Sequence, residues 1–154
     1  MTYDVRIERT TECPTAVVRA NITWREFRGL WRPFLDEVWA FLRASPELRT
    51  DGHNVMLFRN NVPGVEVAVE VGVQVTGPFE PAGRVVPSSL PAADAAIVVH
   101  TGRPAEIGVA HAAVRAWCRA QAHKVTGVFW EIYGDPDPQT GHFDVEVCWE
   151  VARA

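Results

Sequence analysis

One short stretch occurs twice in this chain. Residues 65–71 read VEVAVEV and residues 145–151 read VEVCWEV, so five of seven positions agree at an offset of 80 residues. At the same offset upstream, AVVRAN at 16–21 lines up with AIVVHT at 96–101. A duplicated unit of this size favours two similar modules packed as a pseudo-twofold pair, because neither module alone buries its apolar face.

Each module is predicted to run strand, helix, strand, strand. In the first module Thr23 and Glu26 have the spacing of a capping box at a helix start, and Pro33 should kink or break the first turns. We interpret the apolar stripe of this helix as core packing against a sheet. The stripe comprises Phe27, Leu30, Trp31, Phe34, Leu35, Val38, Trp39 and Leu42.

The second predicted helix begins near Pro104, which suits a first helical position. Its apolar face is weaker and comprises Ile107, Ala110, Val114, Trp117, Cys118 and Gln121. Between the modules, a segment rich in proline and glycine is predicted as a linker. We place module one at about 1–77, the linker at about 78–92 and module two at about 93–154, all within one domain.

The repeated strands alternate with period two. In residues 65–71 the valines point one way, while Glu66, Ala68 and Glu70 point the other way. In residues 145–151 the opposing set is Glu146, Cys148 and Glu150. We expect the valine faces to cover the helices and the glutamates to lie on the other side of the sheet.

The composition excludes several function classes. The net charge is −4, so the chain has no general basic field for nucleic acid or an anionic membrane surface. No apolar run is long enough for a transmembrane helix, and the start lacks an apolar signal core, so a cytoplasmic protein is expected. The scattered Cys13, Cys118 and Cys148 are interpreted as buried thiols, not as a disulfide framework.

Common catalytic and metal-binding motifs are missing from the sequence. His100 on a predicted strand and His111 on a predicted helix could approach each other as metal ligands. Scattered histidines are more often satisfied by ordinary hydrogen bonds, so we predict no metal and no cofactor.

The segment FWEIYGDP at 129–136 places a carboxylate among large apolar and aromatic residues. Glu131 and Tyr133 alternate onto one face. If that face is the glutamate face, both residues line one groove with Glu66, Glu70, Glu146, Cys148 and Glu150. A shielded carboxylate beside aromatic rings suits a lipophilic cation, through its charge and through cation–π attraction. The alternative is that the glutamates lie on a solvated face of the sheet.

These residues resemble the GyrI-like (gyrase-inhibitor-like) family of small-molecule-binding domains. The resemblance rests on LPAADAAIVVHTGRPAEIGVAHAAVRAW at 90–117, WEIYGDP at 130–136 and FDVEVCWEV at 143–151. It implies an α+β fold of duplicated β-α-β-β modules, with a concave antiparallel sheet, two helices on one face and a ligand groove between the modules. It also implies that Glu131, the glutamate of the family's E-x-Y strand, faces that groove, with Tyr133 on the same face.

Two functions remain open. The first is binding of bulky lipophilic, often cationic aromatic molecules. The second, implied by the resemblance, is hydrolysis of cyclopropane-bearing electrophilic natural products, with Glu131 guiding a water and Tyr133 stabilising an oxyanion. The second carboxylate would be Glu70 or Glu146.

Partners are predicted from the same features. Many relatives carry a DNA-binding region before this domain, and we expect no direct nucleic-acid binding and no membrane association here. A monomer is expected, because the duplication already supplies both modules. A protein partner such as gyrase is suggested by the resemblance alone.

Overall fold

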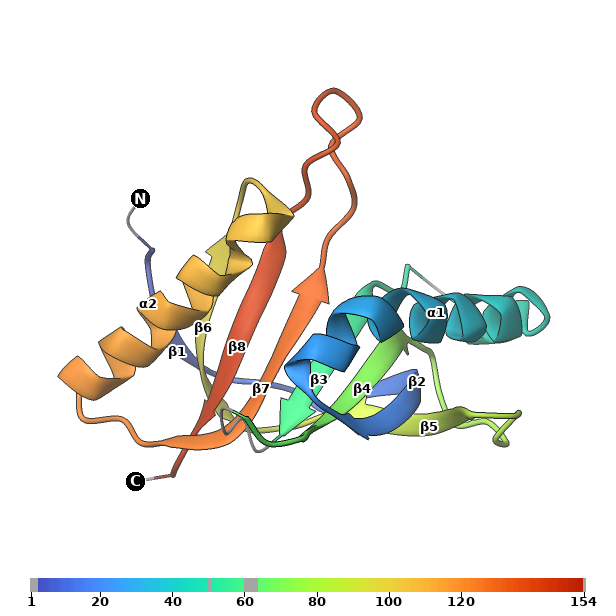
Figure 1. Cartoon of the computed structure of the whole chain (residues 1–154), viewed down its shortest axis with the longest axis horizontal. Helices are drawn as coiled ribbons and strands as arrows, with labels where there is room; N and C mark the ends of the chain where they lie inside the picture. The colour runs from blue at the N-terminus through green and yellow to red at the C-terminus, as the bar shows by residue number, and fades with distance from the viewer. Residues whose placement is uncertain (1–2, 50, 60–63, 154) are drawn as a thin grey trace.

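The computed structural model of the protein describes residues 3–49, 51–59 and 64–153. These residues form one antiparallel sheet of eight strands, and the two long helices lie on the same face of it (Figure 1). This arrangement confirms the predicted α+β class. Among the described residues, no helix combines the length and the apolar character that a bilayer-spanning helix needs.

The elements of the first half are β1 (Arg6–Arg9), β2 (Cys13–Ile22), α1 (Trp24–Arg43), η1 (Pro46–Leu48), β3 (Asn54–Arg59) and β4 (Val67–Gln74). Those of the second half are β5 (Val85–Leu90), β6 (Asp94–His100), η2 (Pro104–Glu106), α2 (Ile107–Ala120), β7 (Val125–Tyr133) and β8 (Val145–Val151). The strand–helix–strand–strand order therefore occurs twice, as β2-α1-β3-β4 and as β6-α2-β7-β8.

The strand order of the sheet is β1-β6-β8-β7-β3-β4-β2-β5. Strands β7 and β3 are neighbours at the centre of the sheet. Outward from this centre, each half of the sheet contains the second, third and first strands of one module, so the two halves are related by a pseudo-twofold axis. Each outermost strand pairs with the module that it does not directly precede in the sequence. β1 precedes module one but pairs with β6, and β5 precedes module two but pairs with β2.

The segment 78–92, predicted as a linker, contains β5. This strand includes Pro87 yet pairs with β2 over six residues. Proline is tolerated here because β5 is an edge strand, where one row of N–H groups has no partner strand. The proline and glycine content of the segment therefore did not reveal the strand.

Helix α1 begins as predicted. The Thr23 side chain accepts from the Glu26 N–H at 3.1 Å, and the Glu26 carboxylate accepts from the Thr23 N–H at 3.0 Å. The prediction of a break at Pro33 is wrong, since the helix runs unbroken from Trp24 to Arg43. Pro33 and Gly29, whose carbonyl loses its helical donor, both lie on the exposed side. Water can therefore satisfy that carbonyl.

The main core lies between the sheet and the helices. It contains the predicted valines of β4 and β8, together with Phe34, Val38 and Leu42 of α1. Val65, predicted on the same face, lies before β4 and is exposed. A smaller cluster, around Trp130 and Leu57, lies on the opposite face of the sheet. We call this opposite face the back face. Phe27, Leu30 and Trp31, at the start of α1, are only partly buried, so the stripe continues beyond the core.

Candidate ligand pocket

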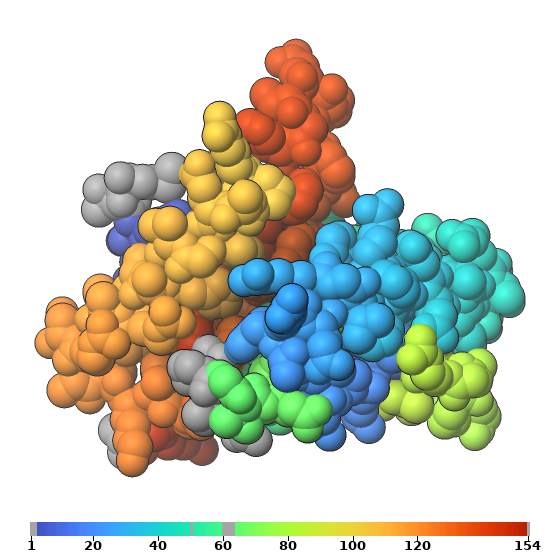
Figure 2. All heavy atoms as spheres, in the orientation of Figure 1, coloured from blue at the N-terminus to red at the C-terminus, as the bar shows by residue number. Residues whose placement is uncertain are grey.

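A cavity of about 500 Å³ opens between the two helices, above the centre of the sheet. We call it the central pocket. Figure 2 shows the molecule hollowed between α2 and the N-terminal half of α1. The lining residues come from α1, β3, η2, α2, β7 and the β7–β8 loop, so both modules contribute to one pocket.

Half of the lining is aromatic. The aromatic lining residues are Trp24, Phe27, Trp31, Phe58, Phe129, Tyr133 and Phe143. Across the two central strands, the rings of Phe58 and Phe129 stack at 5.0 Å between centroids. Trp24 packs on Phe58 at 5.1 Å, and Phe129 stacks on Trp149 at 4.2 Å. The aromatic side chains of the wall are therefore packed against one another across the two modules.

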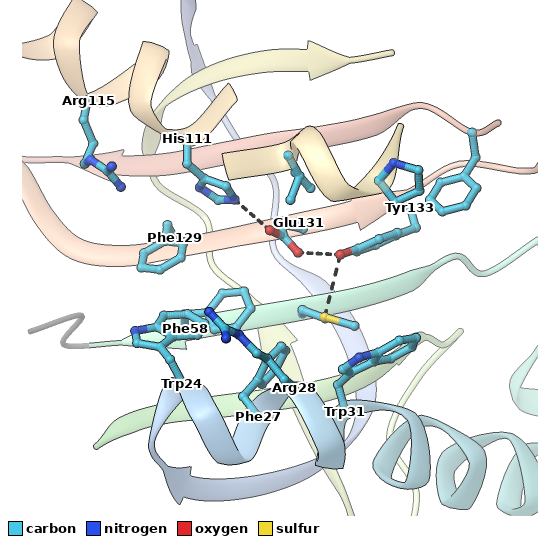
Figure 3. Close-up of a pocket in the computed structure, with 14 residues that line it drawn as sticks. Trp24, Phe27, Arg28, Trp31, Phe58, His111, Arg115, Phe129, Glu131 and Tyr133 are labelled. Atoms are coloured by element: carbon cyan, nitrogen blue, oxygen red, sulfur yellow. Dashed lines mark hydrogen bonds and ion pairs between the residues drawn. The ribbon is translucent and has the colours of Figure 1, made fainter. Parts of the chain in front are cut away.

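Glu131 lies at the floor of the pocket and is 6% exposed. Its carboxylate lies between two side chains that face it from different elements (Figure 3). One oxygen is 2.7 Å from His111 Nε2 on α2, and the other accepts from the Tyr133 hydroxyl at 2.5 Å. The pocket therefore holds a nearly buried carboxylate in a fixed orientation.

The protonation of this group follows from its hydrogen bonds. Trp149 donates its indole N–H to His111 Nδ1 at 2.9 Å. An indole nitrogen only donates, so Nδ1 carries no proton and His111 is neutral, with its proton on Nε2. His111 and Tyr133 both donate to Glu131, which is therefore a carboxylate. Its negative charge is solvated by two neutral donors and is not cancelled by a cation.

Tyr133 keeps its proton. Burial raises the pKa of its hydroxyl, and the negative charge of Glu131 and the hydrogen bond to it raise the pKa further. The phenol is consequently a donor at every physiological pH. It can pass a hydrogen bond to Glu131 or, after a small rotation, to a group bound in the pocket.

The prediction of one groove lined by all the glutamates is wrong. Glu131 pairs directly with Val147 of β8 and Met56 of β3, so it shares the valine face that carries the helices. Residues directly opposite in antiparallel strands point to the same face. Alternation reveals which residues of one strand share a face. Which residues of two different strands share a face depends on the pairing register, and the sequence did not reveal that register. The central pocket therefore contains Glu131 and Tyr133 but none of the other predicted glutamates.

The remaining predicted residues lie elsewhere. On the back face, Glu70 is bonded to Ser88 at 2.6 Å and lies 3.4 Å from Arg19 and 3.3 Å from Arg59. Glu66 is exposed just before β4. Their roles as ligand-binding residues have no support from the central pocket.

Cys148 and Glu146 also lie on the back face. The Cys148 thiol is buried and 3.7 Å from Glu146. Burial, and then the charge of Glu146, raises the pKa of this thiol. Cys148 is consequently a poor nucleophile. Glu150 accepts from Thr126 at 2.8 Å. All three cysteines are free thiols, and Cys118 is buried as predicted, whereas Cys13 is only partly buried.

His100 and His111 do not meet. His100 is hydrogen-bonded to Tyr3 and to the Arg103 carbonyl, while His111 is bonded within the central pocket. Within the described ranges, no group of three or more His, Cys, Asp or Glu side chains is placed to hold a metal ion.

Sequence reasoning missed His111 as a pocket residue. A signal was present, since His111 lies four residues after Ile107 and three before Val114, on the inner face of α2. It also assigned Trp31 and Phe27 to the core, whereas both line the pocket. They occupy the N-terminal end of the stripe, where the side chains are only partly buried.

Solved structures resemble this fold over its whole length. The crystal structure of the EcmrR C-terminal domain superposes with a TM-score of 0.80 at 19% identity, covering 100% of both chains. The fold is that of the EcmrR C-terminal domain. At this identity, the likeness to that domain establishes the fold alone. No protein-family model matches the sequence, and no curated protein sequence matches it.

Two other neighbours are described by what they bind or do. SAV2435, solved with tetraphenylphosphonium bound, superposes with a TM-score of 0.61 at 14% identity, covering 99% of this chain and 94% of that chain. A hydrolase from Listeria innocua superposes with a TM-score of 0.59 at 11% identity, covering 96% of this chain and 91% of that one.

Proposed function

We propose that this protein is a GyrI-like small-molecule-binding protein that captures bulky aromatic, often cationic, compounds in the central pocket. The observation that carries the proposal is the uncancelled carboxylate of Glu131 at the floor of an aromatic-walled cavity of about 500 Å³. That volume lies within the range of drug-sized ligand pockets. Both modules of the chain contribute lining residues, so we expect a monomer to suffice.

The proposal is supported by how the pocket would meet such a compound. The rings of Trp24, Phe58 and Phe129 offer flat apolar surface and cation–π attraction of about 0.5–2 kcal/mol for each good contact. Glu131 adds a charge whose position is held by His111 and Tyr133. SAV2435, which shares the fold, was solved with a lipophilic cation of this type.

The first experiment titrates the protein with tetraphenylphosphonium and follows tryptophan fluorescence. Trp24 and Trp31 line the pocket, so a bound compound should quench them. We expect saturable quenching for the wild type. Glu131→Gln should weaken the affinity at least several-fold, because the substitution removes the charge and retains the shape.

The matched control is Glu66→Gln, which removes one carboxylate of the same strand-repeat pattern at an exposed position outside the pocket. Its affinity should equal that of the wild type. Equal affinity in wild type and Glu131→Gln, or the absence of saturable binding, would contradict the proposal.

Hydrolysis of a strained electrophile is a second candidate. It is favoured by the buried carboxylate beside a phenol that stays protonated, the pair that would hold a water and donate to a developing oxyanion. A hydrolase shares the fold. In this case a cyclopropane-bearing alkylating compound would be recovered as its water adduct by mass spectrometry, and recovered intact after incubation with Glu131→Gln.

A further inference from the structure

The charges around the central pocket are not those of a simple cation trap. Besides Glu131, two lining residues are formally charged, Arg28 on α1 and Arg115 on α2. His111 is neutral, as its bond from Trp149 requires. The lining therefore carries two positive groups and one negative group, and its net formal charge is +1. A guanidinium retains its charge at any physiological pH.

In the part of the chain that the structure describes, neither arginine is paired with a carboxylate. Among the described residues, no acidic side chain lies within ion-pair distance of Arg28 or Arg115. Elsewhere in the chain, Arg59 and Arg19 flank Glu70, and Arg84 is paired with Glu37. Arg115 is half-buried and held over the Trp149 ring, with its Cζ 5.3 Å from the ring centroid.

The two arginines lie apart from the floor of the pocket. In Figure 3 Glu131 is enclosed by His111 and Tyr133, while Arg115 and Arg28 extend from the two helices on either side. Arg28 is exposed, as expected for a residue at the mouth. A compound reaching Glu131 between the helices therefore has the carboxylate at its inner end and guanidinium groups near its outer end.

We propose that the central pocket selects amphoteric aromatic compounds, which carry a cationic group directed at Glu131 and an acidic group directed at Arg28 or Arg115. The inference rests on the proposed function and narrows its ligand class. An aromatic cation without an acidic group leaves both guanidinium groups unpaired and is repelled by them. A carboxylate on the same molecule turns that repulsion into a charge-assisted hydrogen bond, for which the planar guanidinium fork is well shaped.

The test uses two dyes that differ in one group. Rhodamine B carries a delocalised cation and a carboxylate, and rhodamine B ethyl ester carries the same cation with the carboxylate masked. Fluorescence anisotropy measures the affinity of each dye for the wild-type protein. We expect the acid to bind at least five-fold more tightly than the ester, with a ratio that falls as salt is added.

Variants then assign the preference. Arg28→Gln/Arg115→Gln should reduce the acid-to-ester ratio to about one, because it weakens binding of the acid and removes the repulsion of the ester. Arg25→Gln on α1 and Arg119→Gln on α2 are matched controls outside the pocket lining and should leave the ratio unchanged. Because the ratio is measured within each variant, a loss of folded protein affects both dyes alike.

The outcomes separate the two proposals. A wild type that binds the ester as tightly as the acid, or a preference that survives the double substitution, overturns the amphoteric class. If Glu131→Gln nevertheless weakens the ester, the proposed function stands. If neither dye binds but tetraphenylphosphonium does, only the amphoteric class is overturned, and if none of the three compounds binds, both proposals are overturned.

Discussion

At the scale of single residues, the pocket depends on a chain of three hydrogen bonds. Trp149 fixes the tautomer of His111, His111 donates to Glu131, and Tyr133 donates to the other oxygen of Glu131. A carboxylate that is almost fully buried needs such donors, because losing one leaves part of its desolvation cost uncompensated. Each member of the chain therefore affects stability as well as binding.

Replacing Tyr133 by phenylalanine should lower the free energy of unfolding by about 1.5–3 kcal/mol, the range for hydrogen bonds to charged groups. In a Glu131→Gln background the same replacement should cost less, about 0.5–1.5 kcal/mol, because the acceptor is then neutral. Urea unfolding of the four proteins of this double-mutant cycle gives the coupling.

Tyr3→Phe is the matched control for that cycle. Tyr3 is hydrogen-bonded to the ring of His100 at 2.9 Å and does not line the central pocket. Its loss should not couple to Glu131→Gln. Equal costs of Tyr133→Phe in both backgrounds would contradict the role assigned to the Tyr133–Glu131 bond.

At the scale of elements, α1 has two functions along its length. Its C-terminal half buries Phe34, Val38 and Leu42 against the sheet, whereas its first two turns present Trp24, Phe27 and other side chains to the pocket. The capping box at Thr23 therefore stabilises the part of the helix that has the least core beneath it.

Thr23→Ala should lower the free energy of unfolding by about 1 kcal/mol, the typical value for loss of an N-cap. It should also weaken tetraphenylphosphonium binding, because Trp24 directly follows the cap and depends on it for its position. Thr23→Ser retains the capping hydroxyl and should preserve both properties. Chemical unfolding and the fluorescence titration measure the two effects. Unchanged affinity in Thr23→Ala would show that the cap does not position the pocket wall for binding.

The elements also show what the sequence could predict. The duplication, both helices and the repeated strands β4 and β8 carry strong periodic patterns, and these were predicted. β5 was missed because Pro87 and its neighbours read as linker, and its place beside β2 depends on a partner more than 60 residues away. Of the pocket residues, only Glu131 and Tyr133 were predicted. The other residues on their face of the sheet depend on the register of β7 with β8 and β3, which is set by long-range pairing.

At the scale of the whole molecule, the fold keeps several weak acids in their neutral form. Burial raises the pKa of Tyr133 above its ordinary value of 10.0 and that of Cys148 above 9.0. Well below pH 9 both groups are protonated in the folded and in the unfolded chain, so they add no pH dependence there. Above their ordinary values only the unfolded chain releases these protons, so unfolding becomes more favourable as pH rises.

The free energy of unfolding should therefore decrease between pH 9 and pH 11, by at most about 1.4 kcal/mol per pH unit for each group. Tyr133→Phe should flatten the decrease above pH 10, and Cys148→Ala should flatten it from pH 9. Urea midpoints measured across this range under reducing conditions provide the test. A stability that stays constant from pH 9 to pH 11 would show that these groups ionise freely in the folded protein.

The joint between the modules has a consequence for ancestry. Two identical copies of one module, associated as a homodimer about the β3–β7 junction, would present every side chain near the axis twice. A residue on the axis would face its own duplicate, as the equivalent residues Phe58 and Phe129 face each other here, and a glutamate two residues away would occur once on each side of the axis. In the fused chain the residue directly across from Glu131 is Met56, an apolar side chain from the other copy. Two modules in one chain can differ in sequence, so this pocket carries one acidic lining residue, Glu131, where a symmetric homodimer would carry two.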